Sequence, residues 1–205
     1  SMTQGSEAYR RKIAEYYAKK DIIVDSEDII VTTGGSEALS FAMGTIMDND
    51  DEIIIPEPFY ANYNGFATLA GIKIVPVTAR IEDGFSLPPM AEFERAITDR
   101  TKAILICNPG NPTGTKYPDS ALEALAALVQ EKDLFLFADE VYREFTYDGS
   151  NARSVLTVPG LEQHAVVVDS VSKRYSMCGA RIGALVTRNQ AVRRTAMKFA
   201  MARLS

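Results

Sequence analysis

The sequence has only one histidine, His164, and only two cysteines among its 205 residues. A single histidine argues against schemes that need histidine as the catalyst or as a metal ligand, so the chemistry has to come from Lys, Asp, Tyr, Ser or a bound cofactor. Two cysteines without a Cys-x-x-Cys motif argue against a disulfide framework and a zinc site, and they favour a reducing, cytoplasmic setting. We therefore expect no metal site.

Positive charge and long apolar runs are also scarce. The chain has 22 Lys and Arg residues against 27 Asp and Glu residues, a net charge of -5. Domains that bind nucleic acid usually carry a basic surplus, so we expect no nucleic-acid partner. No apolar run approaches the ~18 residues of a membrane span, so we expect no membrane insertion. The composition, 46% hydrophobic and 24% charged, is ordinary for a globular protein.

Seven short runs of apolar and β-branched residues, each bounded by turn residues, predict strands. They span residues 29–33, 52–56, 72–77, 103–107, 134–138, 165–169 and 182–186. Several of these runs are apolar throughout, which is typical of parallel strands that are covered by helices on both faces. Apolar residues at helical spacing predict helices over 7–20, 36–47, 60–69, 90–96, 118–132 and 189–202.

The alternation of strands and helices predicts one α/β domain, a three-layer αβα sandwich around a mostly parallel seven-stranded sheet. The link from Asp169 to Arg181 has about a dozen residues and shows no helical pattern. A parallel crossover usually needs a helix at that point. We therefore expect the last strand to run antiparallel to its neighbour.

Ligands of open α/β sheets bind beyond the carboxyl ends of the strands, so the residues that follow each strand are the candidates. Gly35 and Ser36 follow the first strand and begin a helix, which suits an anion, although a plain turn capped by Ser36 explains them as well. Tyr60 follows the second strand and can either stack on a planar ligand or simply pack. Asn111 lies in a loop with two Asn-Pro steps after the fourth strand.

Charged residues follow the next two strands. Asp139 closes the fifth strand, with Tyr142 three residues later. A buried carboxylate there needs a cation or donors, although a helix N-cap is an equally good reading. Lys173 follows the sixth strand, and Arg181 comes eight residues later. Lysines are mostly solvated surface charges, but one at the end of a buried strand is a better candidate for a reactive amine.

Ser170 and Ser172 flank this lysine segment. The whole set fits one class of ligand. It comprises an anion site, an aromatic residue, an amide, an acid with a tyrosine, and a lysine with serines and an arginine. That class is a flat, phosphorylated, cationic heteroaromatic compound held covalently by an amine.

Three motifs carry a resemblance to a known family. They are Asn108-Pro-Gly-Asn-Pro-Thr-Gly114, Ala138-Asp-Glu-Val-Tyr142, and Ser170-Val-Ser-Lys173 followed by Gly179-Ala-Arg-Ile-Gly183. In this order and spacing the sequence resembles the class I and II aminotransferases of the pyridoxal-phosphate enzymes, which have the aspartate aminotransferase fold. The resemblance runs from about residue 8 to the end, and residues 57–63 look most like aspartate-type members.

The resemblance implies pyridoxal phosphate as the cofactor and an amino acid and a 2-oxo acid as substrates. It implies that Lys173 forms the Schiff base and moves the proton, and that Asp139 pairs with the pyridinium nitrogen. Tyr142 and Asn111 would hydrogen-bond the phenolic oxygen, and Tyr60 would stack on the ring. The residues that it assigns to the phosphate are Gly35, Ser36, Ser170, Ser172 and Arg181. It also implies a homodimer.

Members of the family are about twice as long as this chain. They have an upstream segment with a tyrosine that reaches the neighbouring cofactor, and a C-terminal small domain whose arginine binds the substrate carboxylate. We therefore expect residues 1–205 to be a cofactor-binding large domain, truncated at both ends, that binds pyridoxal phosphate without full activity. Two alternatives remain open: a lyase or synthase of the same fold, and a non-catalytic, aminotransferase-like sensor domain. Cys178 and Ala180 depart from the residues common in the family.

Overall fold

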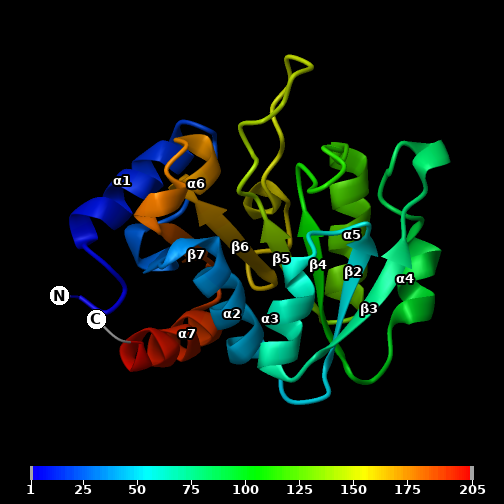
Figure 1. The fold of residues 1–205 in the computed structure, drawn as a ribbon, viewed down its shortest axis with the longest axis horizontal. Coiled ribbons are helices and arrows are strands. Elements are labelled where there is room, and N and C mark those ends of the chain that lie inside the picture. Colours follow the sequence, from blue (N-terminus) through cyan, green and yellow to red (C-terminus); the bar gives the residue numbers. More distant parts are fainter. Residues whose placement is uncertain (1, 204–205) are drawn as a thin grey trace.

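A seven-stranded sheet with helices on both faces forms the body of the protein (Figure 1). The computed structural model describes residues 2–203. The strands are β1 (Ile29–Thr32), β2 (Glu52–Glu57), β3 (Lys73–Thr78), β4 (Thr101–Cys107), β5 (Phe135–Asp139), β6 (Ala165–Ser170) and β7 (Gly183–Val186). The helices are α1 (Glu7–Ala18), α2 (Gly34–Ile46), α3 (Asn62–Ala70), α4 (Met90–Ala96), α5 (Asp119–Glu131), α6 (Val171–Arg174) and α7 (Gln190–Ala202).

The strand order is β1-β7-β6-β5-β4-β2-β3. Neighbouring strands from β6 through β3 pair in parallel, whereas β7 pairs antiparallel with both β6 and β1. The predicted α/β sandwich and its antiparallel last strand are confirmed. The segment before β7 does contain α6, which the sequence analysis did not predict, because four residues make a single turn and show no periodicity.

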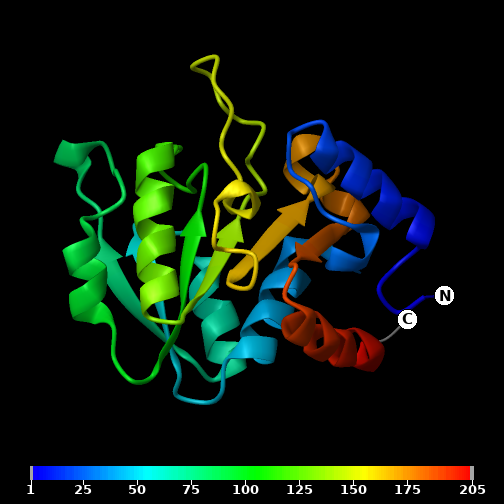
Figure 2. The ribbon, with the colours of Figure 1, turned by 180° about the vertical axis from the view of Figure 1, so that it is seen from behind.

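The two faces of the sheet have separate hydrophobic cores. Helices α2, α3 and α7 cover the face seen in Figure 1, and α1, α4 and α5 cover the face seen in Figure 2. Leu136 and Phe137 are adjacent on β5 and fully buried, yet Leu136 packs in the core of the α5 side and Phe137 in the core of the α2 side. This two-sided burial explains why the central strands are apolar throughout.

The carboxyl ends of the parallel strands lie at one edge of the sheet, at the top in Figure 1. Helix α6 sits on this edge, and the segment that follows β5 projects from it (Figures 1 and 2). Within residues 2–203, no helix combines the length and the apolar character that a membrane crossing requires.

Candidate active site

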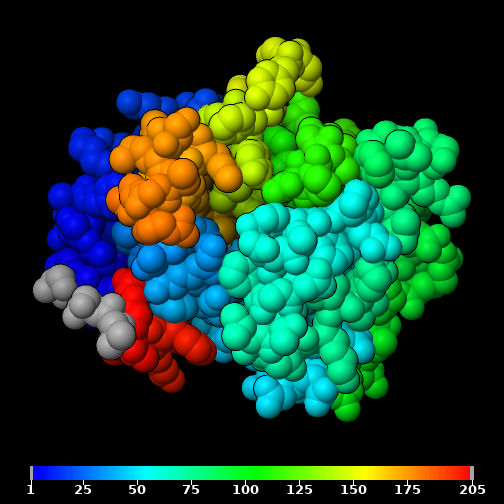
Figure 3. All heavy atoms as spheres, in the orientation of Figure 1, coloured from blue at the N-terminus to red at the C-terminus, as the bar shows by residue number. Residues whose placement is uncertain are grey.

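A cavity of about 230 Å³ opens at the carboxyl edge of the sheet, where α2, α3 and α6 meet. Figure 3 shows the hollow between the orange, blue and cyan segments. All ten residues selected from the sequence line this cavity: Gly35, Ser36, Tyr60, Asn111, Asp139, Tyr142, Ser170, Ser172, Lys173 and Arg181. They come together because successive parallel strands end at the same edge.

One wall of the cavity is built to receive an anion. Helix α2 begins at Gly34, two residues earlier than predicted, and its N-cap residue gives no side-chain hydrogen bond to the first turn. Gly34 has a φ of 74°, and a Cβ there would collide with Nη2 of Arg181. Glycine at this position therefore lets the guanidinium lie against the start of the helix. A guanidinium beside the positive end of a helix favours a phosphate or a carboxylate.

Two serines extend this wall at the start of α6. The Ser170 hydroxyl accepts a hydrogen bond from the backbone N–H of Ser172 at 3.0 Å, which caps the helix. The two hydroxyl oxygens, Ser170 Oγ and Ser172 Oγ, lie 2.8 Å apart. Both serines line the cavity together with Ser36, so three hydroxyl groups accompany the guanidinium.

Asp139 places a buried carboxyl group in the cavity. Its Oδ2 accepts a hydrogen bond from the Tyr63 hydroxyl at 2.8 Å, and its Oδ1 accepts one from the backbone N–H of Val141 at 3.3 Å. Burial raises the pKa of Asp139 to about 6, although both hydrogen bonds act to lower it. Asp139 forms no ion pair with any residue between 2 and 203. A carboxylate in this position lacks a cation, which a bound ligand can supply.

Lys173 and Asn111 complete the polar lining. Lys173 Nζ lies 5.8 Å from the centre of the Tyr142 ring, so the amine and the phenol face the same space. The loop that carries Asn111 is closed by a backbone hydrogen bond from Gly110 to Thr115 at 2.8 Å. Its Asn111–Pro112 bond is cis.

The sequence analysis missed Tyr63, which is fully buried between Asp139 and Tyr60. Its ring meets the Tyr60 ring edge-to-face, with centroids 5.5 Å apart and planes at 89°. Tyr63 lies on α3 rather than at a strand end, so a search limited to strand ends passes it by. Its spacing of three residues from Tyr60 was the available signal. The other unpredicted lining residues are Leu39, Phe66, Cys107, Val141 and Cys178.

The donor set fits the cofactor that the resemblance implies. Pyridoxal phosphate combines a phosphate, a planar ring, a basic ring nitrogen and an aldehyde. The cavity offers a guanidinium with hydroxyls, aromatic side chains, a buried carboxyl group without a cation, and an amine. The described part of the chain has no group of three or more His, Cys, Asp or Glu side chains that could hold a metal ion.

Comparison with known proteins gives consistent matches. The family model described as "Aminotransferase class I and II" matches residues 1–205. The chain is 38% identical to the putative aminotransferase YugH of Bacillus subtilis (strain 168), over 87% of this chain and 46% of that protein. It is 37% identical to the aspartate/prephenate aminotransferase of Thermus thermophilus, over 85% of this chain and 44% of that protein.

Solved structures agree with these matches. The aromatic aminotransferase from Pyrococcus horikoshii OT3 superimposes with a TM-score of 0.91 at 32% identity, covering 97% of this chain and 53% of that one. The chain thus spans about half the length of the relatives that it matches.

Proposed function

The chain belongs to the class I and II aminotransferase family, and from that membership we propose that residues 1–205 form the cofactor-binding large domain of a pyridoxal-phosphate-dependent aminotransferase. The observation that carries the proposal is the cavity itself. It holds an amine, a buried carboxyl group without a cation, and an anion-binding wall in one place. These three features match the three chemically distinct parts of pyridoxal phosphate.

Each residue has a role under this proposal. Arg181, Ser36, Ser170 and Ser172 would bind the phosphate. Tyr60 would pack on the ring, and Asp139 would pair with the ring nitrogen. Asn111 and Tyr142 donate hydrogen bonds to the ring's phenolic oxygen. When bound, the cofactor supplies a ring that accepts the electron pair of the bond broken at the substrate's α-carbon. Lys173 Nζ would hold the cofactor covalently at rest, and once the substrate's amino group had displaced it, the freed amine would move the proton to and from that carbon.

We propose an amino acid and a 2-oxo acid as the substrates and a second copy of the chain as the partner. The names of the relatives, aspartate/prephenate and aromatic aminotransferase, support an amino-acid donor without selecting one. Tyr175 and Met177 follow Lys173 closely and are 55% and 48% exposed. Large exposed apolar side chains beside a cavity support a homodimer interface at this edge.

The amine of Lys173 is the first test of this function. With pyridoxal phosphate, Lys173 Nζ should condense with the aldehyde, releasing one water, and the chain should gain a visible absorption band. Borohydride then reduces the new C=N bond to a stable amine, and peptide mass mapping locates it. We expect the label on Lys173, its loss in Lys173→Met, and its retention in the control Lys132→Met, which changes an exposed lysine. A label spread over many lysines in the wild-type chain would refute the proposed function.

Amino transfer by the 205-residue chain is the second test. We propose that the chain holds the cofactor but transfers amino groups only at background rate. The relatives are about twice as long, so part of what positions their substrates lies outside the region that they share with this chain. Substrate positioning can lower a reaction barrier by roughly 7–11 kcal/mol. The measurement follows oxaloacetate formed from L-aspartate and 2-oxoglutarate. Turnover of about one per second or more, which is typical of a working enzyme, would contradict it.

A further inference from the structure

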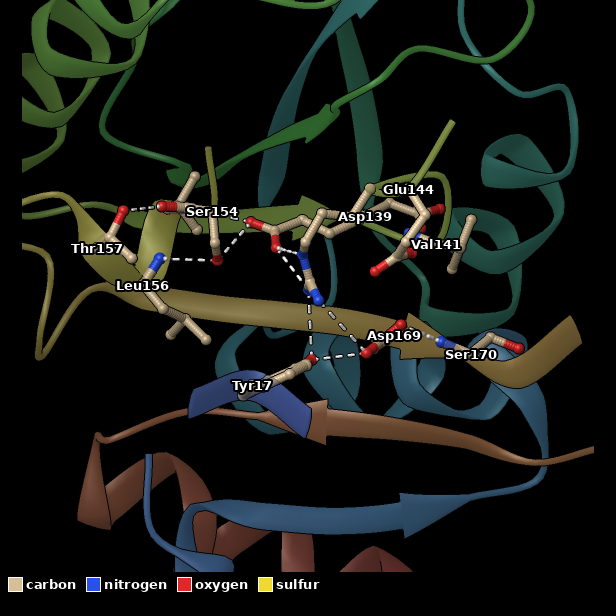
Figure 4. Close-up of polar contacts among 12 residues, drawn as sticks. Tyr17, Asp139, Val141, Glu144, Ser154, Leu156, Thr157, Asp169 and Ser170 are labelled. Atoms are coloured by element: carbon tan, nitrogen blue, oxygen red, sulfur yellow. Dashed lines mark hydrogen bonds and ion pairs between the residues drawn. The ribbon is translucent and has the colours of Figure 1, made fainter. Parts of the chain in front are cut away.

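A cluster of charged side chains adjoins the candidate active site in the chain, and Figure 4 shows the part of it that surrounds Tyr17 and Asp169. We call it the charge network; Glu140, Arg143 and Asp169 in it are buried, and Glu144 and Arg174 are half-buried. None of these residues lines the cavity, and the proposed function gives none of them a role.

Arg143 forms the centre of the network. Its Nε and Nη2 donate to the same oxygen, Glu140 Oε2, at 2.9 and 2.7 Å. The other oxygen of Glu140 accepts hydrogen bonds from Ser154 Oγ at 3.0 Å and from the backbone N–H of Val155 at 2.9 Å. The guanidinium also lies 4.7 Å from the centre of the Tyr17 ring. The residues directly after β5 are therefore tied both to α1, through Tyr17, and to residues 154–155 further along the chain.

Arg174 forms the other half of the network. Its Nη2 donates to Asp169 Oδ1 at 2.7 Å and to Oδ2 at 3.0 Å, and its Nε forms an ion pair with Glu144 at 3.0 Å. Tyr17 joins the two halves, because its hydroxyl donates to Asp169 at 2.8 Å and accepts from Arg143 at 3.3 Å. Burial alone would raise the pKa of Asp169, but the positive charges of Arg143 and Arg174 lower it below its ordinary value.

The network and the cavity share two chain segments. In the first segment, Asp139 and Tyr142 line the cavity, while their direct neighbours Glu140 and Arg143 belong to the network. The second segment repeats this arrangement: Ser170 and Lys173 line the cavity, and Asp169 and Arg174 belong to the network. Four of the five network residues thus directly precede or follow a residue of the site, and the fifth, Glu144, lies two positions after Tyr142.

Helix α6, which carries Lys173, has only four residues. One helical turn gains too few hydrogen bonds to offset the cost of its own nucleation, so outside contacts have to hold it. Its first turn is fixed by the Ser170 cap. Its last residue is Arg174, which is fixed by the carboxylates of Asp169 and Glu144. Arg174 is therefore the anchor closest in sequence to the amine-bearing residue.

We infer that Arg174, held by Asp169 and Glu144, is a positioning residue that fixes helix α6 and so presents the Lys173 amine to the cofactor. The inference rests on the proposed function for the role of Lys173. It goes beyond that function because Arg174 touches neither the cavity nor any ligand within it.

Arg174→Met tests the inference, because methionine keeps much of the length of the side chain and removes its charge. We expect amide hydrogen exchange in peptides covering residues 171–176 to rise about tenfold, since hydrogen bonds to a charged group are lost. Attachment of pyridoxal phosphate to Lys173 should slow by a similar factor. Binding of pyridoxamine phosphate, which has no aldehyde and needs no lysine, should change little. Arg174→Lys should restore part of both losses.

Arg193→Met is the matched control, because Arg193 lies on α7, away from the cavity, and pairs with Asp28. It should leave exchange at 171–176 and labelling of Lys173 at wild-type values. The inference is overturned if Arg174→Met leaves both values unchanged, or if exchange rises throughout the chain and pyridoxamine phosphate binding falls in parallel. If the wild-type chain takes no label on Lys173, the proposed function fails. The exchange experiment then still decides whether Arg174 holds the turn.

Discussion

Replacing Arg143 with methionine is expected to lower the free energy of unfolding by about 3–5 kcal/mol at pH 8, because the change leaves buried carboxylates without their cation. Glu140 is 1% exposed and Asp169 is 3% exposed. Arg143 donates two hydrogen bonds to Glu140 and lies 3.8 Å from Asp169. Urea or guanidinium unfolding of the cofactor-free chain measures the loss.

The pH dependence of this loss follows from the pKa of Asp169. In the folded wild-type chain the pKa of Asp169 is lowered below its unfolded-state value. Ionised Asp169 therefore stabilises the fold at any pH above its unfolded-state pKa, and this stabilisation is lost as the pH falls through the folded-state pKa. Without Arg143 the folded-state pKa rises, and the contribution shrinks or reverses. The difference between variant and wild type should therefore be largest at neutral to alkaline pH and shrink toward pH 4.

Two further variants test the explanation. Adding Glu140→Gln to Arg143→Met should recover part of the loss, because one of the stranded charges is removed. Arg153→Met is the control, since Arg153 pairs with Glu123 near the surface, and such exposed pairs contribute about 0–1 kcal/mol. A loss below about 1 kcal/mol for Arg143→Met would mean that the buried carboxylates find other partners.

Asp139→Asn is expected to have the opposite effect and to stabilise the cofactor-free chain by about 2 kcal/mol at pH 8. Burial raises the pKa of Asp139 from 3.8 to about 6, so the folded state binds this proton more tightly than the unfolded state does. Stability therefore falls as the pH rises from about 4 to about 6, by roughly 3 kcal/mol for two pKa units. Asparagine removes this penalty but loses about 1 kcal/mol of hydrogen bonding to Val141.

Unfolding of both proteins between pH 4.5 and 8 measures this effect. The advantage of the variant should grow with pH up to about 6 and then level off. Tyr63→Phe should lower the stability of the chain at pH 8, because it removes a hydrogen bond to the charged carboxylate and raises the pKa of Asp139 further. Tyr117→Phe is the control, since Tyr117 is buried outside the cavity. An Asp139→Asn variant that is less stable than wild type at pH 8 would contradict the description of Asp139 as a buried carboxyl group without a cation.

The sequence by itself determined the fold class, the approximate bounds of the elements and the ten candidate site residues. Strand and helix patterns are local, so Ile104-Leu105-Ile106 or the spacing of Leu122, Leu125 and Val129 can be interpreted without a partner. The site followed from one geometric rule, that parallel strands end at the same edge. Under that rule, Ser36, Asp139 and Lys173 could be grouped although more than 130 positions separate the first from the last.

Only the tertiary structure decided the partners of those residues. Tyr63 bonds Asp139 across 76 positions, and Tyr17 bonds Asp169 across 152. Neither pair has a local signal, because each depends on the order of the strands and on which helix covers which face. Arg174 was likewise one more arginine in a polar link until β6, the segment after β5, and α1 brought Asp169, Glu144 and Tyr16 around it. Local periodicity fixes where a side chain lies along its own element, whereas burial and ion pairing depend on the packing of elements far apart in the chain.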